Sequence, residues 1–131
     1  MLGTDITTSA QVDAVGRQLF REQWGGVYTR DLLPTAQPNG TRVYVVNTVA
    51  ATGPQTGHWI GVLDTAGSRY FHDSLGTLGR PQRQALAKRF PRAAWAEDDA
   101  EQLPSATDCA VHAMAALTVG LARGPDAFLS L

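Results

Sequence analysis

Two stretches of sequence decide the fold: RVYVVNTV at residues 42–49 and HWIGVLDTAGSRYFHD at residues 58–73. β-branched and aromatic residues dominate the first stretch, which predicts a buried strand. The second stretch predicts two short strands, at 58–63 and 69–73, because turn-forming residues separate them. We expect these two strands to pair as a hairpin.

The sequence before these strands shows the periodicity of a helix. Apolar residues at helical spacing predict a first helix over residues 9–20, with Ser9 as its N-cap. Several proline residues and an Asn-Gly pair then predict a loop over residues 28–40.

Two further helices are expected after the hairpin. One runs from about residue 79 to 90, where the following proline stops it, and a short strand over 93–96 comes next. Residues 109–121 are apolar on nearly every side, which predicts a helix buried all round, capped by Thr107 or Asp108.

Composition limits the classes of protein. A chain of 131 residues with 44% hydrophobic residues predicts one globular domain spanning residues 1–131. The formal net charge of -1 gives no general attraction to nucleic acid.

The number of cysteines and the hydropathy pattern indicate the cellular compartment. Cys109 is the only cysteine, which excludes an internal disulfide and any C-x-x-C metal or redox motif. No apolar run approaches the roughly 20 residues that a membrane-spanning helix needs, and residues 1–10 lack the pattern of a signal peptide. We therefore expect a soluble, intracellular protein that is not secreted and does not act at a membrane.

Cys109 is the first candidate for chemistry, because it lies in the first turn of the third predicted helix. Unpaired N–H groups and the helix dipole favour a thiolate there. A lone cysteine is also a common core residue, so position alone leaves both interpretations open.

Three histidines could act as the base for this thiol. His112 lies one helical turn after Cys109 but fits a core or rim position on an apolar helix. His72 and Asp73 point to opposite faces if both lie in a strand. His58 and Asp73, at the mouth of one hairpin, could bring an imidazole and a carboxylate side by side, which is the sharpest pairing.

Two further candidates for function are an oxyanion donor and a metal site. Gln102 could donate a hydrogen bond to an oxyanion, although by itself it would be interpreted as an exposed amide in a polar loop. A zinc site built from the histidines and Cys109 is disfavoured because no recognisable ligand spacing occurs, so we expect no metal.

Four motifs resemble one protease family. Residues 46–48 (VNT) followed by Gly57-His58-Trp59 resemble the histidine segment of the adenain family, the adenovirus maturation proteases. Residues 70–76 (YFHDSLG) resemble the segment with the acidic triad member in that family and in the SUMO-specific proteases of the same clan. Residues 102–109 (QLPSATDC) reproduce the family's Gln-to-Cys spacing, and residues 26–31 (GVYTRD) resemble the segment before its first strand. The resemblance covers residues 26–121.

The resemblance implies an α+β fold with a mixed, mainly antiparallel sheet packed on a central Cys-bearing helix, a rearranged relative of papain. It implies Cys109 as nucleophile, His58 as general base, Asp73 as orienting acid and Gln102 as oxyanion donor. Trp59 would pack beside the site, and Trp59 and Asp108 are our candidates for substrate contact. No cofactor is implied.

The implied function is that of a cysteine endopeptidase that acts on protein or peptide substrates. The resemblance implies processing of capsid or core precursors of a double-stranded DNA virus or a related mobile element, within the virion and the host cell interior. A protease for ubiquitin-like modifiers is an alternative, because Asp108-Cys109 also resembles the SUMO-protease motif. A catalytically inactive binding module that kept the fold is another.

Three departures from the family pattern matter. Ala110 follows the cysteine where the family usually has glycine, which is expected only to tune activity. The chain ends soon after the central helix, so the resemblance implies a minimal core. The family's activating peptide forms a disulfide with a second cysteine, which this sequence lacks.

Any activator would therefore have to be noncovalent. A peptide could add a strand to an open sheet edge. DNA could bind the basic helix, but the acidic stretch at 97–101 offsets much of that charge, and we expect the basic side chains to form mainly a solvated face; they are Arg80, Arg83, Lys88, Arg89 and Arg92.

Overall fold

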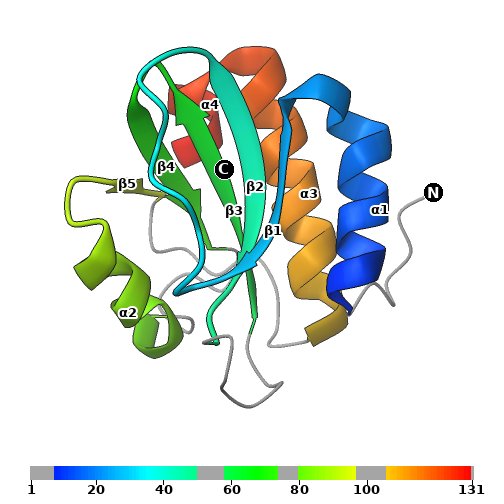
Figure 1. Cartoon of the computed structure of the whole chain (residues 1–131), viewed down its shortest axis with the longest axis horizontal. Coiled ribbons are helices and arrows are strands. Elements are labelled where there is room, and N and C mark those ends of the chain that lie inside the picture. The colour runs from blue at the N-terminus through cyan, green and yellow to red at the C-terminus, as the bar shows by residue number, and fades with distance from the viewer. Residues whose placement is uncertain (1–7, 50–57, 74–79, 97–105, 131) are drawn as a thin grey trace.

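A five-stranded mixed sheet forms the centre of the molecule (Figure 1). The computed structural model describes residues 8–49, 58–73, 80–96 and 106–130, and for residues 80–82 and 106–109 it describes only the helical backbone. The sheet order is β1-β2-β3-β4-β5, with bounds Trp24–Thr29, Thr41–Asn47, Trp59–Thr65, Ser68–His72 and Ala94–Trp95. The two central pairings are antiparallel, whereas β1–β2 and β4–β5 are parallel. The predicted α+β class and mixed sheet are confirmed.

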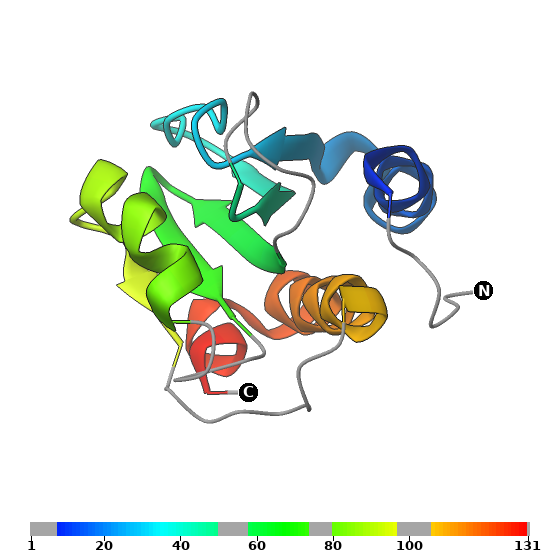
Figure 2. The ribbon, with the colours of Figure 1, turned by 90° about the horizontal axis from the view of Figure 1, so that it is seen from below.

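Helices cover both faces of this sheet (Figure 2). On one face lie α1 (Ser9–Phe20), α3 (Ala106–Arg123) and α4 (Pro125–Leu129), with α3 between the other two. The other face carries α2 (Arg80–Arg89), and a single 3-10 turn, Arg21–Gln23, joins α1 to β1. Each face therefore has its own apolar core.

Alternation along the strands assigns side chains to the two cores. Val43, Val45 and Leu63 pack with α3, whereas Ile60 and Phe71 pack on the α2 side. The hairpin β3–β4 closes through Ala66 and Gly67, which have φ values of 51° and 84°. A two-residue turn with both central φ angles positive matches the twist of the paired strands, which fixes their register.

The position of α3 depends on glycine at Gly61 in β3. A Cβ at that residue would meet the Ala113 carbonyl oxygen and the Leu117 Cγ atom, both at 3.3 Å. Further along, a Cβ at Gly120 would meet Leu63 at 3.1 Å. The helix α3 and the strand β3 therefore run in the same direction, and α3 begins at the end of the sheet where β3 begins.

Several sequence expectations need correction. The N-cap of α1 is Thr8, not Ser9, because Thr8 and Gln11 form a reciprocal capping box. The segment around Tyr28 was predicted as a loop, but it belongs to β1. Its two glycines weaken the strand signal, and its pairing with β2 is a tertiary effect.

The C-terminal helices also differ from expectation. The helix α3 begins at Ala106, so Thr107 and Asp108 lie within it and do not cap it. It is not buried all round, because Ala115, Thr118 and Ala122 are exposed, and small residues tolerate either environment. The short helix α4 was not predicted; Pro125 begins it, since proline suits the first helical turn. Within the described residues, no helix combines the length and apolar character needed to cross a membrane.

Candidate active site

The backbone of His58 is fixed by a hydrogen-bonded pair with Thr48. The His58 N–H donates to Thr48 Oγ1 at 3.1 Å, and the Thr48 N–H donates to the His58 carbonyl oxygen, also at 3.1 Å. Both residues are buried, with exposed fractions of 5% and 4%. The β2–β3 ladder is thereby extended one residue beyond β3, and His58 lies at its end.

Asp73 follows the last residue of β4 and meets His58 there. The His58 Nε2 atom lies 3.4 Å from Asp73 Oδ2, and the two side chains are 6% and 0% exposed. The pairing of Gly61 with His72 brings the two residues together, because Asp73, the residue after β4, comes opposite the first residues of β3. This distance is longer than a strong N–H···O bond, as is common in catalytic pairs without substrate.

His72 is not part of the His58–Asp73 pair. Its ring lies against Phe128 of α4, with 5.7 Å between the ring centroids, and the side chain is 2% exposed. His72 therefore points to the α3 and α4 side of the sheet, opposite to the side where Ile60 and Phe71 pack. This is the geometry expected from strand alternation between His72 and Asp73.

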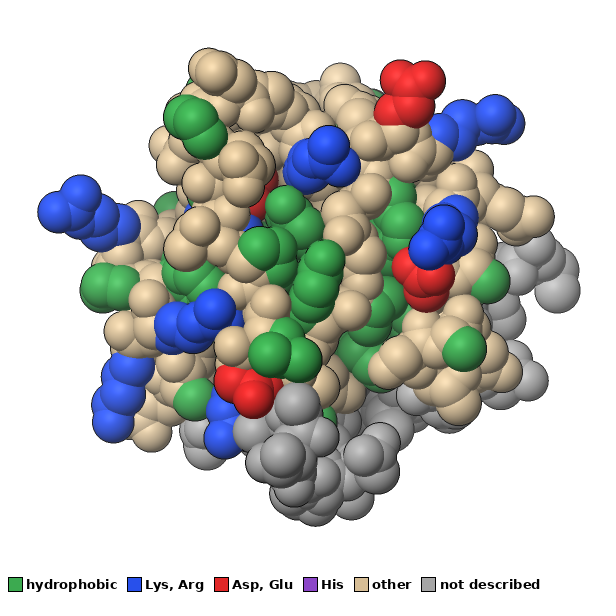
Figure 3. All heavy atoms as spheres, in the orientation of Figure 1, with side chains coloured by type: hydrophobic (Ala, Val, Ile, Leu, Met, Phe, Trp, Pro, Cys, Tyr) green, Lys and Arg blue, Asp and Glu red, His purple; other side chains and the backbone are tan. Residues whose placement is uncertain are grey.

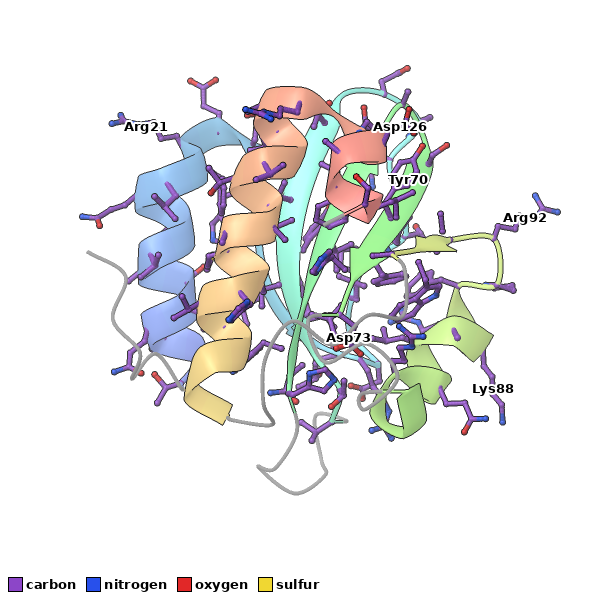
Figure 4. The ribbon with its side chains drawn as sticks, turned by 180° about the vertical axis from the view of Figure 1, so that it is seen from behind. Arg21, Tyr70, Asp73, Lys88, Arg92 and Asp126 are labelled. Atoms are coloured by element: carbon purple, nitrogen blue, oxygen red, sulfur yellow. The ribbon has the colours of Figure 1, made fainter. Side chains whose placement is uncertain are left out.

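Cys109 is the fourth residue of α3, within its first turn. Because α3 starts at the same end of the sheet as β3, this turn lies at the end that carries His58 and Asp73 (Figure 4). The side chains of Cys109 and Asp108 lie outside the described part of the structure, and so does the whole of Gln102. Their predicted roles stay predictions.

Trp59 connects the sheet to the beginning of α3. It is 6% exposed and belongs to the same apolar core as Ala110, Ala113 and Met114. Ala110, the residue directly after the cysteine, is fully buried there, so its methyl group packs inward. The indole of Trp59 is therefore part of the core that α3 covers, and its contact with substrate stays a prediction.

A second carboxylate in the hairpin has a different partner. Asp64 accepts two hydrogen bonds from Arg69, from Nε at 2.7 Å and from Nη2 at 2.6 Å, and both side chains are buried. This pair lies next to the β3–β4 turn, whereas His58 and Asp73 lie at the open end of the hairpin. Asp64 is therefore not available to orient His58.

Two residues near the site were not recognised from the sequence. Thr48 lay in one of the motifs but carried no assigned role, although its hydroxyl anchors His58. Arg30 donates from Nη1 to the Thr48 carbonyl oxygen at 2.7 Å and so anchors Thr48 in turn. Each residue directly follows a strand, and a polar side chain in that position gives no sequence signal for such a contact.

The basic helix α2 differs from expectation at Arg83. The guanidinium of Arg83 lies 4.6 Å from the ring centroid of Trp95, and the residue is 8% exposed. It is a packed side chain and not part of a solvated face. Lys88, Arg89 and Arg92 are exposed.

Metal binding finds no support among the residues described. No group of three or more His, Cys, Asp or Glu side chains in the described ranges could hold a metal ion. In comparisons with known proteins, no family model and no curated sequence matches this chain.

Proposed function

We propose that this protein is a cysteine endopeptidase with Cys109 as nucleophile, His58 as general base, Asp73 as the orienting acid and Gln102 as oxyanion donor. The observation that carries the proposal is the buried His58–Asp73 pair, with 3.4 Å between Nε2 and Oδ2, at the end of the sheet where α3 begins. A buried imidazole beside a carboxylate is the arrangement that general-base catalysis needs.

The proton transfers depend on which ring nitrogen of His58 faces Asp73 and which faces the thiol. Asp73 faces Nε2 of His58, so the thiol would exchange its proton with Nδ1. Transfer of that proton leaves a thiolate at the N-terminal turn of α3, where the helix dipole stabilises negative charge, and an imidazolium that Asp73 stabilises.

Peptide hydrolysis would then proceed in two stages. The Cys109 thiolate attacks the scissile carbonyl carbon, and the resulting oxyanion accepts hydrogen bonds from the Gln102 amide and the Cys109 N–H. The His58 imidazolium gives its proton to the leaving amine, and an acyl enzyme remains. Water, deprotonated by His58, attacks the thioester, and the carboxylic acid product leaves with the thiol restored.

The finer fold assignment is part of the same proposal. A central helix that carries the nucleophile, flanked by α1 and α4 and packed on a sheet that carries the base and acid, is the arrangement of a rearranged papain-like core of the adenain type. Support comes from the chain order His58, Asp73, Gln102, Cys109 and from the contact of α3 with β3. The resemblance alone supports viral precursor proteins as substrates.

The single cysteine makes a direct test practical. Iodoacetamide can label only Cys109 within this chain, so the rate of labelling as a function of pH reports the thiolate at one site. We expect rapid labelling well below pH 8 in the wild-type protein and slow labelling in His58→Ala. The matched control, His112→Ala, should label like the wild type.

Cleavage provides the second half of the test. Mass spectrometry of a peptide library should detect products with the wild-type protein and none with Cys109→Ala, while circular dichroism shows the same fold for both. Cleavage by Cys109→Ala would exclude the proposal. A thiol that labels slowly at every pH, with no cleavage, would instead favour an inactive binding module. Preference for ubiquitin-like fusions over simple peptides would favour a modifier protease.

A further inference from the structure

The α2 side of the molecule carries a pocket beside the end of α2. The helix α2 ends at Arg89, and beyond it a pocket of about 460 Å³ lies between the β1–β2 connection, the β3–β4 turn and the turn that follows α2. Its lining includes Ser68, Phe90 and Pro91. This volume is in the range of pockets that bind a ligand or anchor a side chain.

Phe90 gives the pocket a fixed apolar wall. Its ring lies 4.7 Å from the guanidinium carbon of Arg69 and 4.8 Å from that of Arg89, measured to the ring centroid. The charge of Arg69 is neutralised by its two hydrogen bonds with Asp64. Arg69 therefore holds the ring in place and adds little net charge to the pocket.

The rim of the pocket is positively charged. Arg89 and Arg92 both line it and both are exposed. Among the described residues, no carboxylate pairs with either of them. Arg89 is held in position because its Nη1 donates to the Arg30 carbonyl oxygen at 2.8 Å. Lys and Arg side chains gather along this side of the molecule, at the left of Figure 3.

We infer that this pocket binds an acidic segment of a partner polypeptide, with an apolar side chain against Phe90 and neighbouring carboxylates paired with Arg89 and Arg92. An aromatic wall beside two guanidinium groups that pair with no carboxylate of the described residues matches a ligand that is both apolar and anionic. A polyphosphate backbone would use the charge but not the apolar wall, and the net charge of -1 gives it no general attraction. The inference does not depend on the proposed protease activity.

Fluorescence anisotropy with a defined probe tests this inference. The probe is a fluorescein-labelled decapeptide in which two central leucines are flanked by glutamates. We expect saturable binding to the wild-type protein that weakens as salt rises. Arg92→Gln should weaken binding roughly three- to fivefold, since an exposed charge pair contributes up to about 1 kcal/mol. Ser68→Glu, which adds a carboxylate at the rim, should weaken it at least as much.

The control variant is Arg21→Gln, which removes an equivalent exposed charge on the opposite side of the molecule (Figure 4). It should bind the probe like the wild type. Arg92 is preferred to Arg89 as the test residue because the described contacts of Arg89 include the Arg30 carbonyl. The amide signals of Gly67 and Ala93 should shift on titration in a ¹H–¹⁵N spectrum, which locates the peptide at the pocket.

Four outcomes would overturn the inference. They are no detectable binding, equal binding by Arg92→Gln and the wild type, equal binding of a control peptide with glutamines in place of glutamates, and displacement of the probe by inorganic phosphate or short duplex DNA at lower concentration than unlabelled peptide. The last result would define a phosphate site. Cleavage assays play no part, so failure here leaves the proposed function untouched.

Discussion

The β3–β4 hairpin holds a buried acid–base pair at each end, and the two pairs differ in geometry. Near the turn, Asp64 and Arg69 form two hydrogen bonds of 2.7 and 2.6 Å. At the open end, His58 Nε2 and Asp73 Oδ2 lie 3.4 Å apart. Burial is similar, so the difference lies in the basic partner and in the length of the contact.

In the proposed mechanism the two pairs have different tasks. Arginine keeps its proton at any physiological pH, so the Asp64–Arg69 pair can only hold structure. Histidine changes charge near neutral pH, and a longer contact can tighten when the imidazolium forms during reaction. The surroundings agree, because Arg69 is enclosed by the rings of Tyr44 and Phe90, whereas His58 lies at the end of a strand.

The buried Asp64–Arg69 pair also affects the pKa of its neighbour Tyr44. Burial raises the pKa of the Tyr44 phenol, and the Asp64 carboxylate adds to the increase. The raised pKa keeps the Tyr44 phenol neutral, so its ring provides an uncharged wall for the guanidinium.

The largest expected effect comes from the open-end pair. Asp73→Asn should lower kcat by about 10²- to 10⁴-fold with little loss of stability, because in the proposed mechanism the carboxylate selects the tautomer and stabilises the imidazolium. His58→Ala should lose at least as much. Steady-state kinetics on the peptide identified by mass spectrometry would measure both.

The control for this prediction is His112→Ala, which removes the histidine of α3. It should keep most of the wild-type rate. If His112→Ala were inactive and His58→Ala active, the base would lie on α3 and the comparison between the two pairs would fail. Wild-type activity in Asp73→Asn would likewise remove Asp73 from the mechanism.

The second-largest effect is on stability and is expected at the Asp64–Arg69 pair near the turn. Asp64→Asn leaves the Arg69 charge buried without its carboxylate, which should cost about 3–5 kcal/mol of unfolding free energy. Urea denaturation followed by circular dichroism measures the loss. Replacing both partners, Asp64→Leu with Arg69→Met, should recover much of it, because apolar side chains of similar size need no compensation.

The two variants sharpen the comparison when measured together. We expect Asp73→Asn to lose activity and keep stability, and Asp64→Asn to lose stability and keep kcat while folded. A large stability loss in Asp73→Asn with a small one in Asp64→Asn would reverse the assignment of structural and catalytic roles.

A smaller effect is expected at Thr48, which anchors the open end. Thr48→Val removes the acceptor of the buried His58 N–H, at a cost of about 1–3 kcal/mol in stability. It should also lower kcat by roughly tenfold to a hundredfold, because the imidazole loses its fixed position. Urea denaturation and steady-state kinetics measure the two effects separately.

Thr41→Val provides the matched control at the other end of β2. Thr41 forms a hydroxyl contact of 3.2 Å with Thr65, far from the site, so its loss should leave kcat unchanged. Equal loss of kcat in both variants would show that Thr48 acts on stability alone.

The central strands could be predicted from sequence because β-branched and aromatic residues leave few alternatives. The strand β1 could not, since its two glycines weaken the signal and its parallel pairing with β2 depends on distant residues. Helix α4 was missed because a proline after a helix marks both an end and a beginning.

The site was predictable only in part. A histidine and an acid at the mouth of one hairpin can be paired from strand register alone, and the structure brings His58 and Asp73 together. The anchoring by Thr48 and Arg30 requires knowledge of which loop lies beside which strand, and the burial of Arg83 requires its contact with Trp95. Gln102 and the Cys109 side chain lie beyond what the structure describes and stay predictions.

The smallest effect is expected from a third carboxylate, Asp13, which extends the comparison to the surface. It accepts hydrogen bonds of 2.8 Å from Arg17 Nε and from Trp24 Nε1, and these contacts lower the pKa of Asp13 below its ordinary value of 3.8. A lowered pKa stabilises the folded state fully above pH 3.8, and this contribution is lost as the pH falls through the folded-state pKa.

Thermal unfolding of the wild type and of Asp13→Asn between pH 6 and pH 3 tests this. Since the Arg17 side chain is 73% exposed, solvent screening keeps the contribution small, and the two melting temperatures should differ by only a few degrees at pH 6. The difference should shrink as the pH falls below 3.8, because the carboxyl is then protonated in the unfolded chain and, at its lower pKa, in the folded protein as well. The Trp24 indole N–H signal in a ¹H–¹⁵N spectrum gives a local measure of the same change, since this N–H loses a charged acceptor. A melting-temperature difference that stayed constant across this range would show that Asp13 stabilises the α1–β1 junction through packing and not through its charge.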